Sequence, residues 1–119
     1  MDLDAFRWLL TDAGQRLLAA ASREVQDAGD TLAVQTRLRR SATPEQVATA
    51  LTQATLRLRA RDKLGDLADR MYFTPDGLEQ ATRLRVAQHR AARLVAASAG
   101  TVIDLGCGIG GDLVACARA

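Results

Sequence analysis

A short run of glycines beside one carboxylate is the part of this sequence with the clearest chemistry. Asp104 ends an apolar segment, and glycines follow it at alternate positions: Gly106, Gly108 and Gly110. Glycine lets the backbone turn sharply and approach a ligand closely, because it has no Cβ. A helix that starts near Gly111 would direct its free N–H groups to the same place, where they favour an anion. Asp104 favours a cation there, so the pattern suits a zwitterionic amino-acid moiety.

Two cofactor classes fit this loop. Gly106-x-Gly108-x-x-Gly111 satisfies the dinucleotide fingerprint. Gly106-x-Gly108-x-Gly110 satisfies the looser loop of methyltransferases that use S-adenosyl-L-methionine. A pyrophosphate gains nothing from a carboxylate at Asp104, whereas the ammonium and sulfonium groups of S-adenosylmethionine do. The loop therefore favours S-adenosylmethionine, and a dinucleotide-binding Rossmann enzyme is the alternative.

A strand before the loop and a helix after it would position these residues. Val102, Ile103 and Leu105 are typical of a strand buried on both faces, as in a parallel sheet. Asp104 lies near its carboxyl end, and ligands of open α/β sheets bind beyond that end. We therefore expect residues 99–119 to be the first β-loop-α unit of a Rossmann-like domain, which is incomplete within this chain.

The preceding part, residues 1–98, predicts a helical domain, so the fold class is mainly α. Apolar residues at helical spacing predict helices over 2–10, 12–21, 31–40, 44–63 and 78–98, the last with a break near Ala81–Thr82. Helix-capping side chains precede them: Asp2, Thr11, Thr43 and Thr74. The polar stretch from Ser22 to Asp30, which contains Gly29, predicts a loop.

Composition narrows the class of protein. The 119 residues are 48% hydrophobic with a net charge of +2, so the total charge does not argue for nucleic acid. The two cysteines, Cys107 and Cys116, are too few for a disulfide framework and predict free thiols. There is no apolar run of about 20 residues, and the N-terminus is acidic. We expect a cytoplasmic protein without a membrane span or a metal site.

Two segments resemble a known family. Val102–Asp112 (VIDLGCGIGGD) resembles the first motif of class I S-adenosylmethionine-dependent methyltransferases. Tyr72–Thr82 resembles the segment before the methyltransferase domain in the trimethylguanosine synthase group. Over its whole length the chain resembles the N-terminal part of actinobacterial methyltransferases with a C-terminal THUMP-like domain. This resemblance implies a methyltransferase acting on RNA, such as tRNA or another structured RNA.

The resemblance also nominates site residues. Those that match the cofactor loop are Asp104, Gly106, Cys107, Gly108 and Gly110. In the family the Thr-Pro segment folds over the cofactor, which nominates Phe73, Thr74 and Pro75. Phe73 would pack near the cofactor, while Thr74 has the alternative role of capping the next helix.

The chain also departs from the family pattern. The family's ribose-binding acidic residue and its motif after the fourth strand would both lie beyond Ala119. We therefore expect the chain to be the N-terminal fragment of a methyltransferase, inactive alone, with its catalytic residues unknown.

A helical RNA- or protein-interaction module without catalysis is the alternative from a different class. Two groups of cations favour it: Arg57, Arg59, Arg61 and Lys63, and then Arg83, Arg85, Arg90 and Arg93. No acidic residue lies between Thr82 and Ser98. His89, the only histidine, is expected at the surface, and the oligomeric state is left open.

Overall fold

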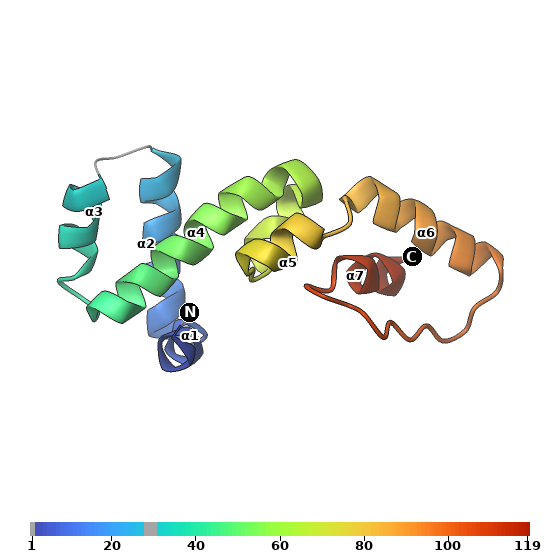
Figure 1. The fold of residues 1–119 in the computed structure, drawn as a ribbon, viewed down its shortest axis with the longest axis horizontal. Helices are drawn as coiled ribbons and strands as arrows, with labels where there is room; N and C mark the ends of the chain where they lie inside the picture. The colour runs from blue at the N-terminus through green and yellow to red at the C-terminus, as the bar shows by residue number, and fades with distance from the viewer. Residues whose placement is uncertain (1, 28–30) are drawn as a thin grey trace. The chain divides into compact units, whose positions relative to one another are not determined.

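The computed structural model describes residues 2–27 and 31–119, and their regular structure is helical (Figure 1). The elements are α1 (Leu3–Leu9), α2 (Asp12–Gln26), α3 (Thr31–Leu38), α4 (Pro44–Leu64), the 3-10 helix η1 (Gly65–Arg70), α5 (Pro75–Gln80), α6 (Leu84–Ala96) and α7 (Gly111–Arg118). They form two compact units, Met1–Leu58 and Arg59–Ala119. The domain boundary predicted at residues 98 and 99 stays a prediction.

Four helices begin at the side-chain caps that the sequence predicts. Each cap oxygen accepts a hydrogen bond from a backbone N–H three residues later and so satisfies one of the free donors of the first turn. The distances are 2.7 Å for Asp2, 3.3 Å for Thr11, 3.3 Å for Thr43 and 3.1 Å for Thr74. The side-chain oxygen of Gln46 also accepts a hydrogen bond from the backbone N–H of Thr43 at 3.0 Å, which completes a capping box.

Helix ends follow the predictions less closely. α2 continues to Gln26, beyond the expected end at Ala21. The predicted break near Ala81–Thr82 is confirmed, because Ala81 and Arg83 have extended backbones that separate α5 from α6. Gly29, in the predicted loop, lies outside the described residues.

The first unit is built around α1 and α2, which join at a very close turn. Leu9, Leu18 and Ala21 are buried in its core. A Cβ placed on Gly14 would lie 2.4 Å from the Cα of Leu9 and 2.4 Å from the carbonyl oxygen of Trp8. Only glycine fits there, because those atoms belong to the backbone and cannot rotate away.

In the second unit α7 lies beside α6 (Figure 1). Their interface is made of small side chains, with Ala87, Ala91 and Ala115 buried together and Cys116 packed against them. Alanines let two helices approach closely, so α7 is fixed by packing although it has only eight residues.

The predicted strand and the Rossmann-like unit are wrong. No strand occurs within residues 2–27 and 31–119, and 101–104 have no regular structure. Val102, Ile103 and Leu105, expected to be buried, are 37%, 78% and 97% exposed. A strand exists only by pairing with another strand, and the described part of the chain offers none. The helix predicted after the loop is present as α7.

The described helices also bear on membrane insertion. None of them is both long and apolar enough to cross a bilayer.

The turn between α1 and α2 gives a stability test. Gly14→Ala should destabilise the first unit by roughly 2–3 kcal/mol, because an added methyl group overpacks backbone that cannot move away. Chemical denaturation followed by the fluorescence of Trp8, the only tryptophan, measures the change. Gly100→Ala is the control, since a Cβ there meets nothing within 4 Å. Equal effects of the two substitutions would contradict this close turn.

Candidate functional site

The loop from Asp104 to Gly110 contains two local turns, although 101–104 before it form no strand. The carboxylate Oδ1 of Asp104 accepts a hydrogen bond from the Gly106 N–H at 3.1 Å. The Gly110 N–H donates to the Cys107 carbonyl oxygen at 2.7 Å, which closes a second turn. Gly108 and Gly110 have positive φ angles of 51° and 82°, which favour glycine.

The space next to the glycines of this loop is open. A Cβ placed on Gly106, Gly108 or Gly110 would meet no atom within 4 Å. Packing inside the unit therefore does not require glycine at these three positions. Their bare backbone is accessible to a ligand.

The loop ends at the N-terminus of α7, where Gly110 is the cap residue and provides no side-chain acceptor. Asp112 lies in the first turn, where a carboxylate is favoured by the helix dipole. Its Oδ1 accepts a hydrogen bond from the guanidinium of Arg90 on α6 at 2.6 Å. The ion pair ties the start of α7 to α6.

The Thr-Pro segment has clear structural roles. Thr74 caps α5, which was its predicted alternative role, and Pro75 is the first helical residue. Both are exposed. Phe73 is only 2% exposed, so its ring belongs to the core of the second unit. Its predicted position beside a cofactor stays a prediction.

The structure brings the two motif segments into contact. A Cβ placed on Gly77, in the first turn of α5, would lie 2.8 Å from the Cγ2 of Ile109 in the glycine loop. It would also lie 2.8 Å from the Oγ1 of Thr74. α5 and the loop therefore meet at a point where a side chain on residue 77 would be crowded from both sides. Sequence reasoning identified both segments but neither of these two contact residues.

The end of α4 and the residues after α5 border the start of α7. A Cβ on Gly111 would lie 3.8 Å from Leu64 Cδ2 and 3.9 Å from the Thr82 carbonyl oxygen. Leu64 is fully buried. The start of α7, where the loop ends, is therefore bordered by α4.

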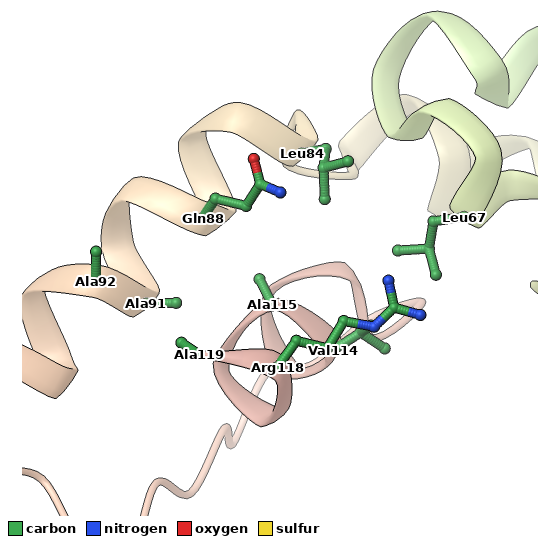
Figure 2. A pocket seen from close by; sticks show the side chains of 9 residues that line it. All are labelled: Leu67, Leu84, Gln88, Ala91, Ala92, Val114, Ala115, Arg118 and Ala119. Atoms are coloured by element: carbon green, nitrogen blue, oxygen red, sulfur yellow. The ribbon is translucent and has the colours of Figure 1, made fainter.

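A separate cavity of about 170 Å³ lies between α6, α7 and η1 (Figure 2). Its lining is mostly apolar, with Leu67, Leu84 and Val114 among the wall residues, and Gln88 and Arg118 add polar groups. Figure 2 shows the Arg118 side chain extending from α7 towards Leu67. No predicted site residue lines this cavity, so it is distinct from the glycine loop.

The basic side chains of the two predicted groups differ in their ion pairs and hydrogen bonds. Arg61 forms an ion pair with Asp69 at 3.0 Å, and Lys63 donates to two backbone carbonyls. In the second group Arg90 is paired with Asp112. Arg85 and Arg93 are exposed and make no ion pair with any residue that the structure describes.

Cysteine and acidic side chains are the candidates for metal and thiol chemistry. Cys107 is exposed and Cys116 half-buried, and both are free, as predicted. Within residues 2–27 and 31–119, no three His, Cys, Asp or Glu side chains gather as a metal site would require.

Comparison with known proteins gives a family match only for the N-terminal part of the chain. Residues 2–60 match a family described as a domain of unknown function, DUF8688. No curated protein and no solved structure matches the chain. The family match covers α1 to most of α4 and includes none of the predicted site residues.

The cap of α7 can be tested directly. Gly110→Ala should destabilise α7 by about 1 kcal/mol, because a side chain is strained at a φ of 82°. Faster amide exchange over residues 111–118 would report the change. Gly106→Ala is the matched control, since its added methyl group meets nothing and the turn to Asp104 needs only the N–H. Equal protection of α7 in the two variants would contradict the strain at Gly110.

Proposed function

We propose that the glycine loop and α5 form part of an S-adenosylmethionine site, and that the protein serves methyl transfer. The observation that carries this is the contact between Gly77 and Ile109. It joins two segments that were each singled out for the same cofactor but lie far apart in the sequence. The site so formed consists of a loop and a helix N-terminus, and no sheet contributes to it.

The residues present suit the amino-acid end of the cofactor. Asp104 is half-buried and uses one carboxylate oxygen on Gly106, so its other oxygen is placed to accept from an ammonium group. The bare backbone at Gly106 and Gly108 leaves room for a ligand carboxylate beside the first turn of α7. Asp112 also lies in that turn, but its charge is balanced by Arg90. S-adenosylmethionine supplies a methyl group activated by its sulfonium, and these residues would hold and orient it.

Removing the charge of Asp104 tests the proposed site. Asp104→Asn keeps an oxygen for the Gly106 N–H but loses the attraction for an ammonium group. It should weaken S-adenosylmethionine binding about tenfold or more, because a hydrogen bond to a charged group contributes ~1.5–3 kcal/mol. Titration of isotope-labelled protein followed by NMR measures even weak affinities.

Asp66→Asn is the matched control for this titration. Asp66 is an exposed carboxylate of the same unit and belongs to η1, not to the glycine loop. Unchanged affinity in Asp104→Asn, or tighter binding of a dinucleotide than of S-adenosylmethionine, would contradict the assignment.

RNA binding by α6 is a second candidate function. Arg85, His89 and Arg93 recur every four residues and so lie along one side of the helix, where all three are exposed. α6 contains no acidic residue. A groove on this helix is lined by Val86, His89, Arg90, Arg93, Leu94 and Ala97. The two arginines of this row, Arg85 and Arg93, would contact the phosphates of RNA.

The salt dependence of RNA binding tests this candidate. The double variant Arg85→Ala/Arg93→Ala should bind tRNA more weakly and should lower the slope of log affinity against log salt by about 1.5, since each lost phosphate contact removes about 0.7–0.9. Fluorescence anisotropy at several salt concentrations measures both. Arg59→Ala/Arg70→Ala removes the same charge from other exposed positions and should change the slope less. Equal slopes for both variants would argue against an α6 interface.

A further inference from the structure

α5 is too short to satisfy its own carbonyl groups. It spans six residues, and the last four carbonyls of a helix have no i+4 partner inside it; the Leu78 carbonyl accepts a hydrogen bond from the Ala81 N–H at 3.3 Å and has room for a second donor. The ammonium nitrogen of Lys63 lies 2.8 Å from the carbonyl oxygen of Leu78 and 2.6 Å from that of Glu79. A cation at a helix C-terminus is also favoured by the helix dipole. Lys63 therefore caps α5 from another helix.

Lys63 belongs to a turn of α4 that reaches both motif segments. Lys63 holds the end of α5, and the next residue, Leu64, lies 3.8 Å from the position of a Cβ on Gly111. Leu64 is fully buried and Lys63 is half-buried. A single turn of α4 is therefore attached to α5 on one side and to the start of α7 on the other.

The hydrogen bond from Lys63 to α5 lies close to the contact between α5 and the glycine loop. Gly77 directly precedes Leu78, whose carbonyl accepts from Lys63, so the two points of attachment are less than one helical turn apart. α5 has only six residues, and Gly77 lies three residues before its last residue, Gln80. Releasing its C-terminal end would therefore displace Gly77 from Ile109.

We propose that Lys63 is a positioning residue for the loop, because its ammonium group holds α5 so that Gly77 stays seated against Ile109. The significance of this for ligand binding depends on the cofactor site proposed above. The geometry itself involves only residues of the second unit.

Arg61 provides a matched comparison two residues away. Its guanidinium pairs with Asp69 on η1, and the two side chains are 40% and 49% exposed. An exposed ion pair contributes little stability. Arg61→Met thus removes a cation from the same end of α4 without touching α5.

NMR of the isoleucine methyl groups tests the proposal on the chain itself. The sequence has two isoleucines, and Ile103 is 78% exposed, so Ile109 gives a distinct signal. The nuclear Overhauser effect between the Ile109 γ2 methyl and the Gly77 α protons should be strong in the unmodified protein. Lys63→Met should weaken it at least fivefold, while Lys63→Arg, which keeps a cationic donor, and Arg61→Met should retain it.

The same samples separate this proposal from the proposed function. Loss of the Overhauser effect in Lys63→Met together with at least fivefold weaker S-adenosylmethionine binding supports both. Loss of the effect in a protein that binds no S-adenosylmethionine supports the hold of Lys63 on α5 and rejects the cofactor site. An unchanged effect overturns the positioning role, whereas a lost effect with unchanged affinity rejects the Gly77–Ile109 contact as part of the cofactor site. If Lys63→Met does not fold, Lys63→Gln provides the same comparison.

Discussion

The close approach of α5 to the glycine loop is the constraint on which the second unit depends. A side chain on Gly77 would be 2.8 Å from Ile109 and equally close to the hydroxyl that caps α5. The cap, the helix and the loop therefore share one small volume, and each limits the others. This explains why a segment with little regular structure is held near α5 and α7.

Some charged side chains of this unit stabilise its structure. Lys63 satisfies carbonyls of α5, and Arg90 balances Asp112 at the start of α7. Arg85 and Arg93, on the same helix as Arg90, remain exposed. Cations that look alike in the sequence thus divide into those that hold elements together and those that face solvent, because only some of them lie within reach of an acceptor.

The loop and the segment before it differ in how well residue type predicts their structure. Asp104 and Gly106 form a turn through a bond between residues two apart, and Gly110 is the N-cap residue of α7. These local features follow from residue type. Val102, Ile103 and Leu105 have the composition of a buried strand but are exposed. Their burial would require partner strands, and no local pattern can supply a partner.

The sequence by itself determined the helical character of the chain, the caps at Asp2, Thr11, Thr43 and Thr74, and the break between α5 and α6. Each depends on groups within about one helical turn, where residue identity decides the outcome. Only the tertiary structure decided that 101–104 form no strand, that Gly77 meets Ile109, and that Lys63 caps α5. These depend on contacts between segments distant in sequence, whose free energy comes from packing and pairing that no single segment contains.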